Sequence, residues 1–269
     1  MSLRAMASVE ATKALRQPAT YVLLGILAAY VVLIVIAFAS ILAAPQGAGL
    51  DPAALLAPLR ADAVGFVASL AVSIGTLTLV VFAAQSVAQE FTRGTLRTLL
   101  LARARRIDVA LAKVALLAVA ALLLALLAVA AGVGGAAVFG MVSGETLLKT
   151  TPRDVAILLV RAWALLLGWA LIALGTTLGS RSLGVGLGST LGALVAGDVL
   201  RSLLAGLGQA GVWASRALPN AALSALGPGG HVGASDWGWI APNLLVWVVA
   251  LNVLAVRSLL RLDIISATK

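Results

Sequence analysis

Charged residues that could support specific chemistry are concentrated in one stretch, which runs from Glu90 to Lys113 and reads EFTRGTLRTLLLARARRIDVALAK. Helical phasing places Leu96, Leu99 and Leu100 on one side of this stretch and displaces the arginines from them: Arg93, Arg97 and Arg103. The pattern predicts an amphipathic helix that lies along a membrane face. Such a helix could dock onto a protein partner through pairs of opposite charges. An anchor on anionic lipid would need only the basic residues, whereas this stretch also contains Glu90 and Gly94. A simple basic anchor is the alternative.

Few residue types remain for covalent or metal chemistry. The chain has no cysteine, which excludes disulfides, thiolate metal sites and cysteine nucleophiles. His231 is the only histidine, and one imidazole in a glycine-rich segment makes a poor metal site. No lysine follows a glycine, so the G-x-x-x-x-G-K-[ST] phosphate loop is absent. We therefore assign no catalytic, cofactor-binding or metal-binding residue, and we expect no cofactor in this chain.

Two further charged groups fall within apolar stretches. Asp198 is the only acid well placed to act as an ion relay inside a membrane. Arg201 lies three residues later on the same helical face, so a pair between the two side chains is the simpler expectation. For Arg161 we expect either a pair with Asp154 or a side chain extended to the membrane surface.

Membrane-spanning helices must position these groups. Hydrophobic residues make up 62% of the chain and charged residues 11%, and the mean hydropathy is +1.10, whereas a soluble domain carries about 25% charged residues. Continuous Leu, Ala and Val runs without polar alternation argue against a membrane β-barrel. The predicted fold class is an all-α polytopic membrane protein with about six transmembrane helices, because the charge-free gaps approach the roughly 20 residues that cross a bilayer. The expected spans are residues 20–43, 64–88, 113–139, 155–179, 183–204 and 240–260.

The remaining segments complete one transmembrane domain over residues 1–269. Residues 1–18 predict an interfacial helix, with a disordered basic tail as the alternative, and residues 89–106 predict a cytoplasmic helix. Residues 205–239 form an outer loop in which we expect short helices that turn back toward the membrane. With a cytoplasmic amino terminus, 13 lysines and arginines fall inside and 5 outside, which predicts a multi-pass protein of a bacterial or archaeal cytoplasmic membrane with both termini cytoplasmic.

The stretch after the second predicted span resembles the ABC-2 family of transporter permeases. In that family a Glu, an aromatic residue, Gly-Thr-Leu-Arg and a Leu pair join the second and third spans. Many members also carry a proline shortly before the last arginine, where this chain has Ala104. The matching residues here are Glu90, Phe91, Gly94, Thr95, Leu96, Arg97, Leu99 and Leu100, followed by Arg105, Arg106 and Lys113.

The resemblance implies that residues 89–106 form a coupling helix that docks into a cleft on a separate ATP-binding cassette subunit. ATP and Mg²⁺ would bind that subunit, so the present chain is expected to be a transporter subunit and not an enzyme. Its other expected partners are a second copy of itself or a similar permease, and membrane lipid, with no nucleic acid. The residues expected to couple to the ATPase are Glu90, Phe91, Arg93, Gly94, Thr95, Leu96, Arg97 and Leu100.

The expected function is therefore ATP-driven translocation, in the export direction, of a hydrophobic or amphiphilic substrate, because the spans carry few polar groups. Two other functions stay open at this point. One is a non-transporting membrane anchor or scaffold that recruits a soluble partner through the same helix. The other is an ion-coupled secondary transporter.

Small residues recur at four-residue intervals in the fifth predicted span, at Gly184, Gly188 and Gly192, with Ala196 next. Such a face lets two helices approach closely in lipid, where packing drives association. It predicts either helix packing within one subunit or a surface where two copies meet. A smaller cluster of Gly132, Gly135 and Ala136 indicates the same kind of contact in the third span.

The charge distribution makes a topological prediction. A cysteine at position 97 should react with a membrane-impermeant maleimide only from the cytoplasmic side, and a cysteine at position 225 only from the outside. The parent chain is a clean background because it contains no cysteine. Modification of both positions from the same side would contradict the predicted topology.

Overall fold

The computed structural model describes residues 8, 12, 16, 18–43, 57, 59–92, 106–144, 146, 150–227 and 237–260. All regular secondary structure in these ranges is α-helical, which confirms the expected all-α class. The helices are α2 (Pro18–Ala43), α4 (Ala63–Thr92), α6 (Arg106–Ser143), α7 (Pro152–Ser180), α8 (Leu183–Ala205), α9 (Gly208–Arg216), α10 (Pro219–Leu226) and α11 (Trp237–Leu260).

Long apolar helices identify the chain as a polytopic membrane protein. Four stretches among the described residues have the length and hydropathy to cross a membrane: Ala63–Phe91, Val109–Ser143, Pro152–Ser180 and Leu183–Leu204. Shorter apolar stretches lie in α2 and α11, at Ala28–Ala37 and Gly238–Leu254. Every range predicted as a span lies within one of these six helices, and the number of actual crossings stays a prediction.

Local sequence sets the ends of α7 and α8. Thr151 caps α7, its hydroxyl accepting from the backbone N–H of Asp154 while the carboxylate of Asp154 accepts from the N–H of Thr151, and Pro152 occupies the first turn. α7 ends at Ser180, and the residue that caps its C-terminus, Arg181, adopts a left-handed conformation with φ of 56°. Ser182 then caps α8. This two-residue connection makes α7 and α8 adjacent neighbours.

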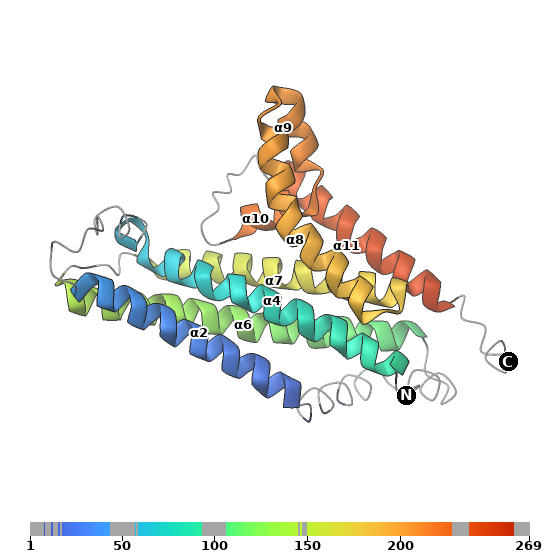
Figure 1. Cartoon of the computed structure of the whole chain (residues 1–269), viewed down its shortest axis with the longest axis horizontal. Coiled ribbons are helices and arrows are strands. Elements are labelled where there is room, and N and C mark those ends of the chain that lie inside the picture. Colours follow the sequence, from blue (N-terminus) through green and yellow to red (C-terminus); the bar gives the residue numbers. More distant parts are fainter. Residues whose placement is uncertain are drawn as a thin grey trace.

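The centre of the bundle is formed by α4, α6 and α7, which lie side by side along the long axis of the molecule (Figure 1). Their contact is filled by Ala, Val and Leu side chains, of which Val80, Ala121 and Leu166 are completely buried. α2 packs across α4 and α6, and α11 packs along α7. α8 begins beside the end of α7 and then diverges from the bundle, with α9 at its far end (Figure 1).

α4 and α6 approach each other closely at glycines. A Cβ atom added to Gly132 would lie 2.6 Å from the backbone oxygen of Val64, and one added to Gly135 would lie 3.1 Å from Val67 Cγ1. Ala136 is completely buried beside them. The small-residue cluster of the third predicted span therefore packs helices within one subunit.

In the segment from 205 to 239, where we expected short helices, the described residues form α9 and α10. α11 holds the turn between them, because Asn243 Nδ2 donates to the carbonyls of Arg216 (2.6 Å) and Leu218 (3.2 Å), and Trp247 Nε1 donates to that of Ala217 (2.8 Å). α10 then lies against α7, α8 and α11, with Leu223 completely buried. Whether α10 enters the membrane stays a prediction.

The glycine contact can be tested by a pair of substitutions in one helix. Gly132→Leu should destabilise the protein by about 1–3 kcal/mol, because the side chain must displace the α4 backbone. Gly134→Leu is the matched control, since an added Cβ there has no neighbour within 4 Å and the gain in helix propensity is the same. Thermal unfolding in detergent, followed by size-exclusion chromatography, measures the difference. Equal midpoints for the two variants would contradict this packing.

Candidate functional site

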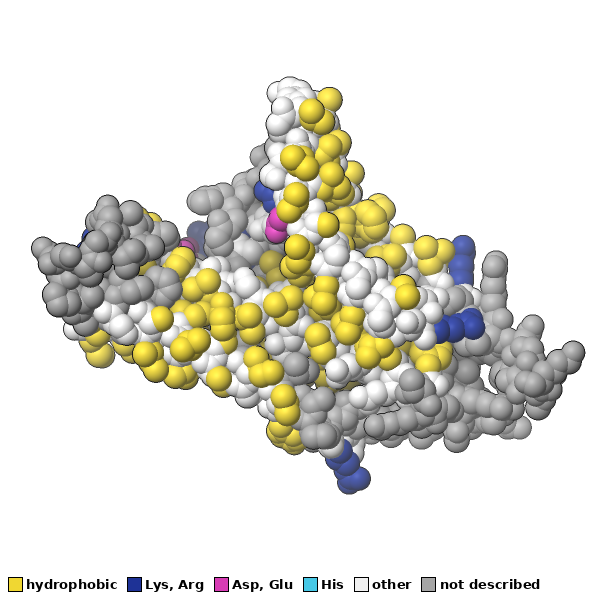
Figure 2. Space-filling view, viewed as in Figure 1, with side chains coloured by type: hydrophobic (Ala, Val, Ile, Leu, Met, Phe, Trp, Pro, Cys, Tyr) yellow, Lys and Arg dark blue, Asp and Glu magenta, His cyan; other side chains and the backbone are white. Residues whose placement is uncertain are grey.

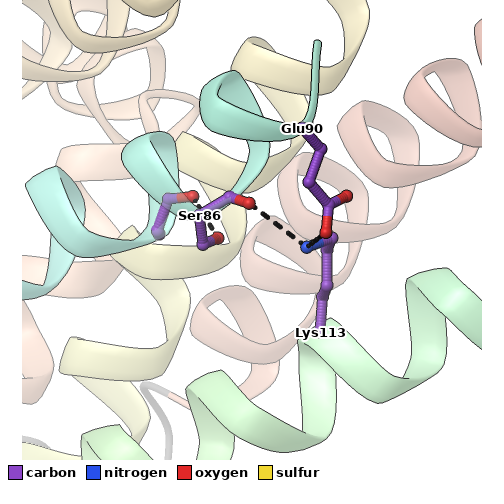
Figure 3. A network of polar contacts seen from close by, with 4 residues as sticks. Ser86, Glu90 and Lys113 are labelled. Carbon is purple, nitrogen blue, oxygen red and sulfur yellow. Dashed lines mark hydrogen bonds and ion pairs between the residues drawn. The ribbon is translucent and has the colours of Figure 1, made fainter. Parts of the chain in front are cut away.

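A buried ion pair joins the end of α4 to the beginning of α6. Lys113 Nζ lies 3.0 Å from Glu90 Oε1, and the two side chains are only 2% and 6% exposed. The ammonium also donates to the backbone carbonyl of Ser86 at 3.3 Å (Figure 3). Ser86 and Glu90 are four residues apart and thus share one face of α4, which Lys113 meets from α6.

This pair stands where the predicted coupling segment leaves and re-enters the bundle. α4 ends at Thr92 and α6 begins at Arg106, at the same end of the molecule (Figure 1). We expected Glu90 to pair with a basic group near the start of the segment, and the structure places Lys113, from beyond its far end, beside the carboxylate. Because the pair is buried, the stability of the fold should be sensitive to substitution of either residue. Removing one partner of a buried ion pair lowers the free energy of unfolding by about 3–5 kcal/mol, because the remaining charge loses its compensation.

The other predicted coupling residues are only partly within the described ranges. Phe91 is half-buried and packs against the main hydrophobic core. Six predicted positions lie outside the described residues: Arg93, Gly94, Thr95, Leu96, Arg97 and Leu100. The structure therefore locates the two helix ends that flank the segment, and the roles of these six residues stay predictions.

A second polar cluster surrounds α10, towards the opposite end of α4. Asn220 Nδ2 donates to Asp198 Oδ1 at 2.7 Å, and Arg201 Nη1 donates to Ser224 Oγ. Asp198 and Arg201 are neighbours on one face of α8, and the two α10 residues are four apart, so two side-chain contacts join the helices in parallel. The expected pair between Asp198 and Arg201 is wrong, because each side chain is directed to a polar group of α10 instead.

Arg161 reaches the end of α10 from α7. Its Nη2 donates to the carbonyl oxygens of Ala225 (2.8 Å) and Gly227 (2.9 Å). Carbonyls at a helix C-terminus lack intrahelical partners and carry a partial negative charge, so a guanidinium is favourable there. Asp154, one of the two alternatives expected for Arg161, instead accepts hydrogen bonds from Thr151 at the start of α7.

Sequence patterns alone did not identify the α10 contacts. Asn220 and Ser224 are the polar residues of an otherwise apolar octapeptide, PNAALSAL, and their spacing of four was a usable signal of a polar helix face. What the sequence could not show is that α10 folds back against α8, which follows from the α9 turn and from its contacts with α11.

The glycine face of α8 points away from its own subunit. Gly184, Gly188 and Gly192 are exposed, and a Cβ atom added to Gly188 or Gly192 would have no neighbour within 4 Å. The residues with which α8 packs inside the subunit are others: Gly186, Thr190 and Gly197 are buried, and an added Cβ at Gly197 would lie 2.9 Å from Asn220 Cβ. Gly188 and Gly192 thus make no close helix contact within the subunit. A contact between two copies at this face stays a prediction.

A family model described as ABC-2 family transporter protein matches residues 7–193. The chain belongs to the ABC-2 transporter family. It is accordingly a membrane permease subunit of an ABC transporter and a multi-pass membrane protein. A comparison with curated proteins found no match. The family match includes the Glu90–Lys113 pair and ends before Asp198, so the polar cluster around α10 lies beyond it.

The buried pair makes a stability prediction for this ABC-2 permease. Lys113→Met should destabilise the folded protein by about 3–5 kcal/mol, because Glu90 would remain buried without its cation. The double variant Glu90→Gln with Lys113→Met should recover most of that loss, because two neutral side chains replace the pair. Thermal unfolding of the purified chain measures both. A double variant as unstable as Lys113→Met alone would show that the ion pair is not what Lys113 contributes.

Proposed function

We propose that this permease exports a hydrophobic or amphiphilic substrate, pairing with a second copy of itself or a similar permease and receiving its energy from two ATP-binding cassette subunits. ATP and Mg²⁺ would bind those subunits, and the segment 89–106 would transmit their motion. Family membership supports association with an ATP-binding subunit and dimerisation.

The observation that carries this proposal is the Glu90–Lys113 pair. It ties the two helices that flank the coupling segment at one buried point, 3.0 Å between charged atoms. A pair of charges in a low-dielectric interior resists separation much more than the same pair in water. A force applied to residues 93–105 would therefore move α4 and α6 together, and with them the core that both helices share with α7.

The packing of the bundle supports a pathway between two subunits. The described interface of α4, α6 and α7 is filled mainly with apolar side chains, which disfavours a substrate route through it. α8 diverges from these helices and exposes its glycines together with Val185, Val195 and Val199. Because small residues allow close helix contact in lipid, this surface is where we place the second permease.

The same packing supports the proposed class of substrate. Few polar side chains are buried among the described residues, which favours an apolar or amphiphilic cargo over a sugar or an ion. The polar cluster around α10 lies away from the Glu90–Lys113 end of the bundle, so motion received at one end would be used to open or close the other. We propose that this movement carries the substrate outward.

The proposal predicts that charge reversal in the coupling segment uncouples the transporter. Arg97→Glu should leave membrane insertion intact but weaken ATPase association or abolish substrate-stimulated hydrolysis, because a broken charge pair at a desolvated protein interface costs about 2–5 kcal/mol. Arg257→Glu is the matched control, since Arg257 is an exposed base in the last turn of α11 and each lipid-facing base is worth only about 1 kcal/mol.

Co-purification of the ATPase and reconstituted transport measure both variants. If Arg97→Glu assembles and transports as well as Arg257→Glu, Arg97 does not couple. If Glu90→Ala and Gly94→Leu are silent as well, the segment is not a coupling helix. Stoichiometric recovery of a partner without ATPase activity would favour a scaffold instead.

A further inference from the structure

A groove of about 500 Å³ opens where α8 diverges from α4, and we call it the α10 groove because α10 closes one of its sides. Its lining combines two chemistries. Five of its residues are apolar: Val72, Leu77, Leu165, Trp169 and Leu194. The polar ones are Ser69, Ser73, Thr76, Asp198, Arg201, Asn220 and Ser224. Figure 2 shows acidic and basic side chains adjoining where the α8–α9 arm rises from the bundle, with hydrophobic surface above and below.

Asp198 and Arg201 retain most of their binding capacity. The carboxylate accepts one hydrogen bond from Asn220, although its two oxygens can accept about four. The guanidinium donates to Ser224, although it has five N–H groups. Both residues are exposed. A charged residue in a membrane-facing segment is costly, and holding α10 through one neutral partner each does not require a charge on either side chain.

The hydroxyl groups that α4 contributes to the groove can accept hydrogen bonds from a ligand, because their protons are already donated within the helix. Ser69, Ser73 and Thr76 each donate their hydroxyl proton to a backbone carbonyl of their own helix, at 2.6–2.8 Å. The oxygens of these hydroxyls can still accept a hydrogen bond. Among its described lining residues, the α10 groove thus combines hydroxyl acceptors and the carboxylate of Asp198 with the cationic donor Arg201. An ammonium group can donate to the carboxylate and the hydroxyl oxygens, and a phosphate or carboxylate can accept from Arg201.

We propose that the α10 groove binds the zwitterionic headgroup of an amphiphile, with its ammonium at Asp198 and the hydroxyls of Ser69 and Thr76, its anion at Arg201, and its hydrocarbon along Leu77, Leu165 and Trp169. The inference rests on the proposed export of an amphiphile and names its class. The groove lies in the half of the bundle remote from the Glu90–Lys113 pair, so its occupant approaches from the membrane between α4 and α8.

The test uses protection of a single cysteine, which requires neither ATPase nor transport. Ser73 lines the groove and is exposed, so Ser73→Cys supplies the only thiol of the chain. The full-length permease in alkyl maltoside micelles is treated with maleimide while short-chain phosphatidylethanolamine is added. Phosphatidylglycerol and diacylglycerol with the same acyl chains are the comparison probes. Ser180→Cys, exposed at the far end of α7, is the control for general shielding by lipid.

Phosphatidylethanolamine should slow modification at position 73 but not at 180, at lower concentration than either comparison lipid. In the Ser73→Cys background, Asp198→Asn and Arg201→Gln should each raise the half-protecting concentration about tenfold or more, because each removes a charge-assisted hydrogen bond. Leu77→Trp, which narrows the apolar side without touching α10, should do the same. That variant keeps the proposal testable if the charge substitutions loosen α10.

Equal protection by all three lipids would overturn the proposal, because the groove would then be only an apolar cleft. Protection unchanged by Asp198→Asn, Arg201→Gln and Leu77→Trp would also overturn it. Asp198 and Arg201 would then serve only to hold α10 in place. The proposed function fails separately: selective protection without lipid-stimulated ATPase activity in the reconstituted complex would keep the site and refute export. Transport without selective protection would keep export and refute the site.

Discussion

Hydrocarbon offers no hydrogen-bond partner to a peptide group or a charged side chain, and the rest of this structure depends on that constraint. Backbone groups are satisfied within the long helices α2, α4, α6, α7, α8 and α11. Polar side chains inside the bundle must find partners in the protein. The buried ammonium of Lys113 takes Glu90 and a carbonyl of α4, and Arg161 takes two carbonyls at the end of α10. Each such contact joins two helices. The cost of leaving a polar group without a partner in hydrocarbon therefore makes these residues the specific contacts between otherwise apolar helices.

These polar contacts between helices lie at two levels of the molecule, which the central helices connect. At one level, the Glu90–Lys113 pair joins α4 to α6 beside the segment that we assign to ATPase coupling. At the other, α10 is held by α7 and α8 through Arg161, Asp198 and Arg201. Between them the packing of α4, α6 and α7 is dense and rich in alanine. Close-packed interiors transmit displacement as rigid bodies, so a movement at one level would reach the other through α4 and α7.

Glycine has two different uses in these helices. Gly132 and Gly135 allow α4 and α6 to touch, because any Cβ there would meet Val64 or Val67. Gly188 and Gly192 have no neighbour within 4 Å, although their spacing in the sequence is the more regular of the two. Regular spacing describes one face of a helix, and it contains no information about which molecule covers that face. The regular stripe is therefore available to a partner, whereas the irregular cluster is part of the fold.

The sequence by itself determined the fold class, the positions of the long helices and the family, because bilayer thickness and hydropathy act locally along the chain and the motif from Glu90 to Leu100 is contiguous. Only the tertiary structure decided the partners of the charged residues. The sequence favoured Arg201 as the partner of Asp198, and it offered Asp154 or the membrane surface for Arg161. In the structure Asp198 and Arg161 both contact α10 instead, because α9 reverses the chain and brings α10 against α7 and α8. Glu90 and Lys113 are likewise 23 positions apart and meet because α4 and α6 are antiparallel neighbours. A charge in an apolar bundle pairs with the nearest polar group in space, and that distance depends on how helices pack and not on their order in the chain.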